Sequence, residues 1–398
     1  MPYGERYRPD RLFLPQQMLL SADLPTPYYL YDEDGIRKTA RTILGSFRLN
    51  AGYTPYFPLK ANCTPAVLRA LVDEGFGILA LSEPELRFAH ALGFSGERLL
   101  FHTPAMTERA AVLCLETGAG VIFDSPCQIE RFGAHLPERC LLRYHPGKTK
   151  NSVHYSGNTD RNKSGMSREQ VFDAAKLLSA RGVHFGLHCH LGAGSRMEAF
   201  YPNAAAELFG LARELYAETG IRAEFCDIGG GLGVSDTPGE PDLNLPRIGA
   251  LVRGQYEQYF SDEFAPQLFT ELGRFALARH GILISRVAEV RERTRRYAVL
   301  DASAAYVPHI LLHHAQHHIS VVGKSAKHGR MVYSVHGCTA DAQDRFHDRA
   351  MLHELHAGDL AAIHNVGAYA ESMQLCHSML PPCRSFIYTL DGRIISAE

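Results

Sequence analysis

The chain lacks the features of a secreted, membrane-spanning or nucleic-acid-binding protein. No apolar run approaches the roughly 18 residues that a membrane-spanning helix needs. Residues 1–10 are polar and charged with no hydrophobic run behind them, so we expect no signal peptide. The formal net charge of −2 creates no strong field of one sign. Neither a nucleic acid nor a membrane surface is therefore expected as a partner.

The cysteines lack the pattern of a disulfide framework. Their number is odd, nine, and they are scattered without a Cys-x-x-Cys pair. Such thiols are typical of reduced proteins, so we expect a cytoplasmic location. The sequence also lacks internal repeats and low-complexity linkers, and its 398 residues are enough for two domains with ample cores.

What the sequence does contain is a regular alternation of short apolar strands and helical patterns. Strands are predicted at residues 77–81 and 120–123, each followed by a helix, and a long helix at 203–218. Alternation over ~250 residues predicts an α/β protein with a (β/α)8 barrel. Later segments resemble strands of a β-rich domain. The predicted parts are an N-terminal segment (1–34) whose strand 28–31 joins the β domain, the barrel (35–285), and the C-terminal β domain (286–398).

Lys60 is the most informative side chain, because it directly follows the apolar, strand-like residues 56–59. An amine at the carboxyl end of a buried strand is costly unless it is paired, deprotonated or covalently used. A desolvated lysine readily forms Schiff bases. On its own, Lys60 is better interpreted as a strand-end lysine whose amine reaches water.

A glycine cluster follows a second predicted strand in residues 225–233, which read Phe-Cys-Asp-Ile-Gly-Gly-Gly-Leu-Gly. Glycine permits positive φ and lets backbone N–H groups approach an anion. At the mouth of a parallel barrel, such a turn can hold a phosphate. The spacing is not the dinucleotide-binding fingerprint, and a plain turn is the commoner explanation.

Two charged residues, Glu271 and Arg274, follow the apolar strand 267–269. A carboxylate there can keep a pyridine nitrogen protonated, which makes the ring an electron sink. The guanidinium fork of Arg274 suits a phosphate. The alternative is an exposed ion pair between loop residues.

His188 and His190 stand two residues apart, before the sequence Leu-Gly-Ala-Gly-Ser at 191–195. In an extended strand both rings point to one face. The pair suggests a metal site at first sight, although no acid or further histidine is nearby in sequence. A neutral imidazole lying on a cofactor ring fits equally well, and a core histidine is a third interpretation of similar weight.

Two polar segments complete the set. Residues 337–346 carry Cys338 and Asp341 on a loop that begins with glycine, and residues 365–373 place Tyr369 after a Gly-Ala turn. Together and in this order, the five segments resemble the fold-type III pyridoxal-phosphate decarboxylases. That family includes ornithine, arginine, diaminopimelate and carboxynorspermidine decarboxylases. The resemblance runs from about residue 25 to residue 398.

The resemblance implies pyridoxal 5′-phosphate as the cofactor and a homodimer with shared active sites. Lys60 would bond to the cofactor, and His190 would stack on its ring. Glu271 would hold the pyridine nitrogen, and Tyr369 would lie beside the phosphate. The phosphate would be held by Gly229, Gly230, Gly231 and Arg274.

Departures from the family pattern point to a divergent member. In relatives a loop cysteine, supplied across the dimer interface, helps protonate the carbanion that remains after CO2 leaves. Ala340 stands at that position here, and Cys338 lies two residues earlier. Asp341 retains the acidic position, which implies a cationic distal amine on the substrate. The other departures are Leu79, Ala193 (with Ser195 two residues on), Leu272, Cys376 and His377.

The implied activity is decarboxylation of an amino acid, either a diamino acid or a carboxylated diamine of a biosynthetic pathway. Lys60, His190 and Cys338 are the predicted catalytic residues. The alternatives are an amino-acid racemase and a cofactor-binding regulator without turnover. Glu271 disfavours the racemase, because racemase sites of this type use arginine at the pyridine nitrogen.

Two further segments lie outside this set. The polar residues 148–165 predict a long excursion at the barrel top that would act as a lid. Five histidines fall within ten residues, but no acid accompanies them, so solvent or an interface is the favoured environment over a metal site. They are His309, His313, His314, His317 and His318.

Overall fold

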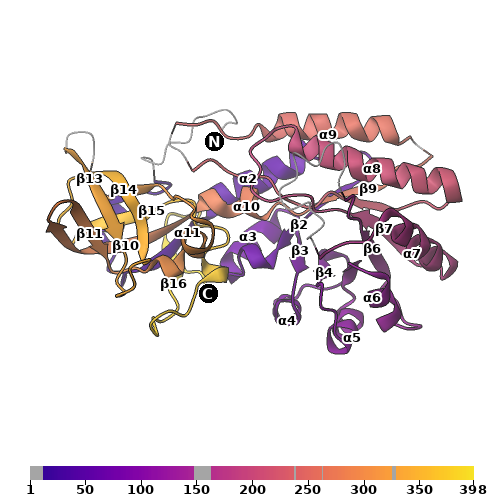
Figure 1. Cartoon of the computed structure of the whole chain (residues 1–398), viewed down its shortest axis with the longest axis horizontal. Helices are drawn as coiled ribbons and strands as arrows, with labels where there is room; N and C mark the ends of the chain where they lie inside the picture. Colours follow the sequence, from indigo (N-terminus) through magenta and orange to yellow (C-terminus); the bar gives the residue numbers. More distant parts are fainter. Residues whose placement is uncertain (1–11, 148–162, 237–238, 262, 325–328) are drawn as a thin grey trace.

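The computed structural model describes residues 12–147, 163–236, 239–261, 263–324 and 329–398. Two bodies lie side by side, a helix-wrapped barrel and a β-rich domain (Figure 1). The predicted fold class, a (β/α)8 barrel with a C-terminal β domain, is therefore confirmed. Most of the proposed lid, residues 148–162, lies outside the described residues.

Eight parallel strands form the closed barrel, and β9 completes it by pairing with β2. Their short sequences are almost wholly apolar and buried, as expected for strands covered on both faces. The strands are β2 (Tyr53–Pro58), β3 (Gly77–Ala80), β4 (Leu99–His102), β5 (Gly120–Phe123), β6 (Arg139–Arg143), β7 (His184–His188), β8 (Phe225–Asp227) and β9 (Gln267–Thr270).

Local signals set the ends of the outer helices. The N-terminus of α7 is closed by a capping box between Ser167 and Gln170, and α5 ends at Gly118, whose φ of 65° suits glycine. The helices are α2 (Glu33–Ser46), α3 (Pro65–Asp73), α4 (Glu83–Ala91), α5 (Glu108–Thr117), α6 (Pro126–Arg131), α7 (Arg168–Ala180), α8 (Phe200–Thr219), α9 (Leu245–Tyr259) and α10 (Gly273–Leu277).

Arg139 fills the amino end of the barrel. Its guanidinium carbon lies 5.1 Å from the centroid of the Phe225 ring and 5.8 Å from that of Phe269. Its Nη1 donates a hydrogen bond of 2.9 Å to the Tyr56 hydroxyl. The interior above is packed with apolar side chains, Leu79 among them. Because this interior is a core rather than a pore, side chains with chemical functions gather at the carboxyl end.

The β domain is a nine-stranded sheet in which β1 lies between β10 and β16. β1 pairs antiparallel with β10 and parallel with β16, so a strand from residues 28–32 lies inside the C-terminal sheet. The predicted domain boundary at residues 285 and 286 falls within β10. The strands are β1 (Tyr28–Asp32), β10 (Gly281–Glu292), β11 (Arg296–Leu300), β12 (Ile319–Val321), β13 (Arg330–His336), β14 (Arg345–His353), β15 (Leu360–Ile363), β16 (Arg384–Tyr388) and β17 (Ile394–Ser396).

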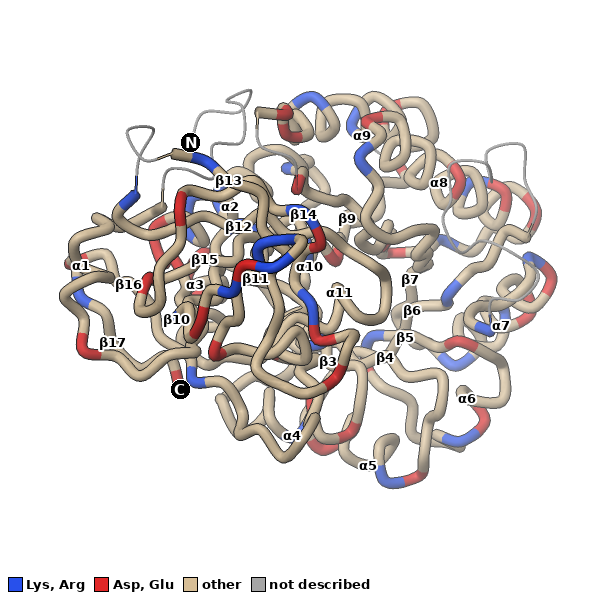
Figure 2. Tube along the Cα trace, turned by 60° about the vertical axis from the view of Figure 1, so that its left-hand side comes forward, with Lys and Arg blue, Asp and Glu red and all other residues tan. Residues whose placement is uncertain are grey.

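Two short helices belong to this half of the molecule, α1 (Gln16–Ser21) and α11 (Pro308–His313). α11 lies on the side of the β domain that faces the barrel (Figure 1). Acidic and basic residues are interspersed over the outer helices (Figure 2), in keeping with the net charge of −2. Among the described helices, none has both the length and the apolar character needed to cross a bilayer.

Candidate active site

Lys60 lies just beyond the carboxyl end of β2. The strand stops at Pro58, and a 3-10 turn (Leu59–Ala61) carries Lys60 into an exposed position. Lys60 therefore reaches water, as the interpretation of a strand-end lysine predicts. Its main chain is held by the C-terminal half. The Ser372 hydroxyl donates to the Lys60 carbonyl (2.7 Å), and the Tyr369 N–H donates to the Ala61 carbonyl (2.7 Å).

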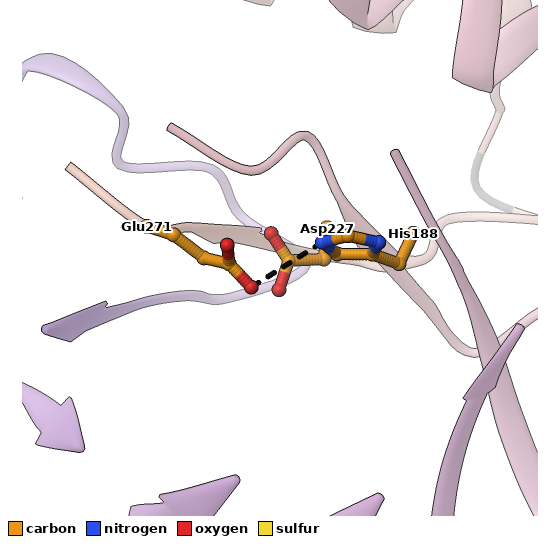
Figure 3. A group of neighbouring side chains, drawn as sticks. All are labelled: His188, Asp227 and Glu271. Carbon is orange, nitrogen blue, oxygen red and sulfur yellow. Dashed lines mark ion pairs between the residues drawn. The ribbon is translucent and has the colours of Figure 1, made fainter. Parts of the chain in front are cut away.

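Glu271 lies between the two histidines that the sequence singled out. It follows β9 directly, and its Oε1 is 3.3 Å from Nε2 of His188 (Figure 3). Its Oε2 is 3.7 Å from Nδ1 of His190. Oε1 accepts no hydrogen bond in the described structure, so its approach to His188 is an ion-pair contact only. The acid that His188 and His190 lack in sequence is thus supplied by a neighbouring part of the barrel.

The three groups have strongly shifted pKa values. Burial lowers the pKa of His188 to about 4, although Glu271 acts in the opposite direction. Burial also lowers the pKa of His190, and the charge of Lys60 adds to this effect. Although burial alone raises the pKa of Glu271, contact with His188 and His190 holds it well below 4.5. Glu271 is therefore an anion at neutral pH, flanked by neutral imidazoles.

Asp227, at the end of β8, is a site residue that the sequence analysis did not identify. It is fully buried beside Glu271 and His188 (Figure 3), and one polar atom from each of the three lies within 4.8 Å of the others. Its Oδ1 accepts a hydrogen bond of 2.8 Å from the Gly229 N–H. Burial and the charge of Glu271 raise the pKa of Asp227 well above its ordinary value.

The glycine turn is packed tightly against the strand ends. Gly229 and Gly231 have φ values of 66° and 109°, which favour glycine. A Cβ added to Gly230 would lie 2.2 Å from the carbonyl oxygen of Glu271. The Gly229 carbonyl accepts from the Glu271 N–H at 2.7 Å, and the Gly231 carbonyl from the Ser195 N–H at 2.8 Å. The turn therefore joins the His190 segment to Glu271.

Arg274 and Tyr369 lie together on the other side of the mouth. The guanidinium carbon of Arg274 is 4.8 Å from the centroid of the Tyr369 ring. Nη2 of Arg274 donates to Nε2 of His309 on α11 at 2.9 Å. Burial, reinforced by the charge of Arg274, lowers the pKa of His309 to about 4. His309 is therefore a neutral acceptor that the β domain supplies to the barrel.

The histidine stretch thus has several environments. His313 and His314 are exposed, as expected, but His309 contacts Arg274, and His317 is 6% exposed. The Nδ1 of His317 lies 2.8 Å from the His364 carbonyl oxygen. The expected environment of solvent or an interface is therefore not met by His317, which is buried within the β domain, whereas His309 lies where α11 meets Arg274 of the barrel.

A further charged cluster lies at the ends of β4, β5 and β6. Nε2 of His102 is 3.0 Å from Oδ2 of Asp124, and Nε of Arg143 is 3.7 Å from the other oxygen of that carboxylate. The His102 ring centroid lies 6.1 Å from that of His188. Sequence analysis missed this cluster, although a signal exists. From β4 to β9, each strand has an ionisable residue at its last position or one beyond: His102, Asp124, Arg143, His188, Asp227 and Glu271.

Cys338 and Asp341 lie in the β domain. Cys338 is exposed, and its N–H donates to the Ala302 carbonyl at 3.0 Å. Partial desolvation and the negative charge of Asp344 both raise the pKa of its thiol. Asp341 forms an ion pair of 3.7 Å with His377. Asp341 lines a cavity of about 750 Å³ together with other residues of the β domain, among them Cys376 and His377. The hydrogen bonds and the ion pair of Cys338 and Asp341 join these two residues to the β domain rather than to the barrel mouth.

Comparisons with known proteins agree with this geometry. Residues 34–278 match the sequence pattern of the pyridoxal-dependent decarboxylases, in the part described as the pyridoxal binding domain. The chain is 29% identical to Protein TabA of Pseudomonas amygdali pv. tabaci, over 99% of this chain and 93% of that one. It is 31% identical to a diaminopimelate decarboxylase of Actinosynnema pretiosum subsp. auranticum, over 89% and 82%.

A similar solved structure is that of diaminopimelate decarboxylase from M. jannaschii in co-complex with L-lysine. It has a TM-score of 0.88 at 21% identity, covering 96% of this chain and 91% of that one. At this identity the likeness supports the fold, whereas the family pattern covers more than half of the chain. The chain therefore belongs to the family of pyridoxal-dependent decarboxylases, and pyridoxal phosphate is its cofactor.

Proposed function

We propose that this enzyme decarboxylates a diamino acid or a carboxylated diamine, with Lys60 as the residue that bonds to the cofactor. The observation that carries the proposal is the ionised Glu271, held between His188 and His190 at the barrel mouth. A buried carboxylate there stabilises a protonated, cationic pyridine nitrogen, as the decarboxylation chemistry requires. The same anion disfavours a racemase.

The residues at the mouth fit pyridoxal phosphate on physical grounds. Lys60 offers an exposed amine, and Glu271 an anion. Arg274 offers a guanidinium already oriented by the Tyr369 ring and His309. The chemistry that pyridoxal phosphate supplies when bound is withdrawal of the electron pair left at Cα once the α-carboxylate has departed as CO2.

The protein groups orient the reactants and hold or move protons. With the cofactor bound, Glu271 would keep the proton on the pyridine nitrogen, His190 would stack against the ring, and Arg274 would bind the phosphate together with the glycine turn of residues 229–231. Tyr369 would lie beside the phosphate, and burial raises the pKa of its hydroxyl to about 12, so the hydroxyl stays protonated. Cys338, supplied across a dimer interface, returns a proton to Cα.

The substrate class is proposed from Asp341 and from the relatives. Asp341 is a half-exposed carboxylate that suits a cationic distal amine. Relatives include named diaminopimelate decarboxylases, and one structural neighbour is described as a lysine/ornithine decarboxylase complexed with putrescine. All of these names refer to substrates or ligands with two amino groups. We further propose a cytoplasmic homodimer in which the loop of residues 337–346 completes the partner's site.

The test is a screen of the purified enzyme for CO2 release across L- and D-diamino acids and carboxylated polyamines. We expect release from at least one of them, and none from Lys60→Ala. Borohydride should trap the cofactor on Lys60 in the wild-type chain. Glu271→Gln should bind cofactor but turn over at least about 100-fold more slowly, as for removal of other preorganised electrostatic groups. Trapping of cofactor in Lys60→Ala, or unchanged turnover in Glu271→Gln, would contradict the assignment.

A further inference from the structure

Two carboxyl groups are buried side by side beneath the barrel mouth. Asp227 and Glu271 end the adjacent strands β8 and β9 and are 0% and 7% exposed. Oδ2 of Asp227 is buried without a hydrogen-bond partner in the described structure. Figure 3 shows the two groups next to each other, with His188 as their common neighbour. Two carboxylates so close in a dry environment resist simultaneous ionisation.

The surrounding groups do not supply the positive charge that two anions would require. His188 and His190 are neutral, for the reasons given above. Arg143 on β6 lowers the pKa of Asp227 only weakly, and its Nε contacts Asp124 instead. The hydroxyl groups of the neighbouring tyrosines are also neutral, because burial raises their pKa values. They are Tyr53, bonded to Thr270, and Tyr201, whose hydroxyl donates to the Gly229 carbonyl.

The contacts of Asp227 and Glu271 differ, and the difference indicates which of the two carboxyl groups carries a proton. Glu271 has an imidazole nitrogen near each oxygen, at 3.3 and 3.7 Å. Oδ2 of Asp227 and Oε1 of Glu271 both lack a hydrogen-bond partner in the described structure, but only Oε1 lies at ion-pair distance from an imidazole nitrogen. The other oxygen of Asp227 is bonded to the Gly229 N–H, so a proton on Oδ2 disturbs neither that bond nor a contact with histidine. We infer that Asp227 and Glu271 hold a single proton between them at neutral pH, and that it resides on Asp227.

The protonated Asp227 is a positioning residue that acts through Glu271. It stands beside the anion without adding a second negative charge, so that one net charge faces the cofactor ring. This role toward the cofactor rests on the proposed function, but the protonation state does not. The amide of Asp227→Asn reproduces the shape and neutrality of the protonated acid. Asp227→Ala removes the group and serves as the matched comparison.

The protonation state is tested by infrared spectroscopy of the full chain, prepared with and without pyridoxal phosphate. At pH 7 we expect the carbonyl band of a buried carboxylic acid, sensitive to exchange into D2O and absent in Asp227→Asn. In Glu271→Gln, the midpoint pH at which this band disappears should fall by about one unit or more, because the neighbouring anion is gone. Absence of the band in the wild-type chain, or its persistence in Asp227→Asn, overturns the inference. An unchanged midpoint overturns the shared proton.

Kinetics test the positioning role separately. Asp227→Asn should keep kcat within about threefold of wild type and the same visible absorption of bound cofactor, whereas Asp227→Ala should not. An equal loss of kcat in Asp227→Asn and Asp227→Ala would show that Asp227 acts through a property other than its neutral charge. The infrared measurement on the cofactor-free chain does not depend on decarboxylation. The shared proton and the proposed activity can therefore fail independently, and the two experiments distinguish the two failures.

Discussion

At the scale of single residues, His309 is the least expected member of the site. It comes from α11, yet its neutral imidazole accepts from Arg274, the arginine proposed to bind the phosphate. A hydrogen bond to a charged group contributes about 1.5–3 kcal/mol. Although the imidazole itself lacks a role in the electron chemistry, it fixes the direction in which the guanidinium fork points.

We therefore predict that His309→Ala weakens binding of pyridoxal phosphate by about 10-fold or more, as expected for about 1.4 kcal/mol or more. Binding of pyridoxal, which has no phosphate, should change little. Titration of the cofactor-free enzyme with each compound measures the difference. Leu312→Ala, exposed on the same helix, is the control and should bind both as the wild type does. An equal loss for the two compounds would indicate a general disturbance of the mouth.

Cys338 poses a different question, because it stands two residues from the family position at Ala340. A two-residue shift along an extended strand moves the sulfur by roughly 6–7 Å. If Cys338 is the proton donor, Cys338→Ala slows turnover and increases protonation at C4′ of the cofactor, which leaves pyridoxamine phosphate. Chromatography of the released cofactor measures this side product. Normal turnover of Cys338→Ser without the side product would assign the proton to another group.

At the scale of elements, the glycine turn after β8 is the tightest junction of the site. A Cβ at Gly230 would meet the main chain of Glu271 rather than a movable side chain. We predict that Gly230→Ala displaces Glu271, costs about 1–3 kcal/mol of stability, and reduces kcat. Thermal unfolding and turnover measure the two effects. Gly45→Ala on α2, where the structure leaves open space, should be neutral or stabilising by up to about 1 kcal/mol. A Gly230→Ala enzyme as stable and active as wild type would contradict the packing argument.

Much of the element pattern is predictable from the sequence. The predicted strand at 120–123 agrees with the structure to the residue, because a short apolar run between turn residues defines both of its ends. Lys60, Glu271 and the glycine turn were identifiable because each follows a strand directly. The neighbours that tune them were not. Asp227 belongs to the same run as the glycines, and its burial beside Glu271 depends on the register of β8 and β9.

The contact between His309 and Arg274 is also beyond sequence reasoning. The two residues are 35 positions apart and lie in different halves of the molecule. Periodicity places His309 on a short helix, but the packing of that helix against the barrel decides whether the ring meets solvent or a guanidinium. Packing of this kind depends on the whole β sheet, and local patterns carry no information about it.

At the scale of the whole molecule, the separation of Asp341 from the barrel mouth favours a composite site. We predict a homodimer in which Lys60 of one subunit works with Asp341 of the other. Mixing inactive Lys60→Ala with inactive Asp341→Ala chains should restore about a quarter of wild-type sites, since half of the random dimers are mixed and each has one intact site. Activity after verified subunit exchange measures this. No recovery would argue that each subunit works alone.

Buried histidines make the stability of the molecule depend on pH. His364 is 5% exposed, bonds to Ser320 through Nε2, and has its pKa lowered to about 3 by burial. The unfolded chain, with an ordinary pKa of about 6.5, binds the proton first as the pH falls. The stability contribution is therefore complete above about pH 6.5 and is lost as the pH falls toward 3.

When the pH is lowered from 7 to 5, the unfolding free energy of the wild type should fall by about 2 kcal/mol more than that of His364→Gln. Denaturant titrations at the two pH values give the difference directly. The comparison between variants cancels opposing contributions such as that of Asp32, whose pKa burial raises to about 6. His90→Gln, exposed on α4, is the control. Parallel stability curves for wild type and His364→Gln would refute the prediction.

The position of β1 between β10 and β16 has a consequence for the order in which the chain assembles during synthesis. At about 5–20 residues per second, the roughly 350 residues that separate β1 from β16 take about 20 to 70 s to emerge from a ribosome. The barrel strands, which are contiguous in sequence, can close within that time. One edge of β1 (Tyr28–Asp32) stays unpaired until β10 has been synthesised, and the other stays unpaired until β16 follows. The strand that joins the beginning of the chain to its end is therefore the segment most exposed to wrong pairing and to chaperones in the growing cell.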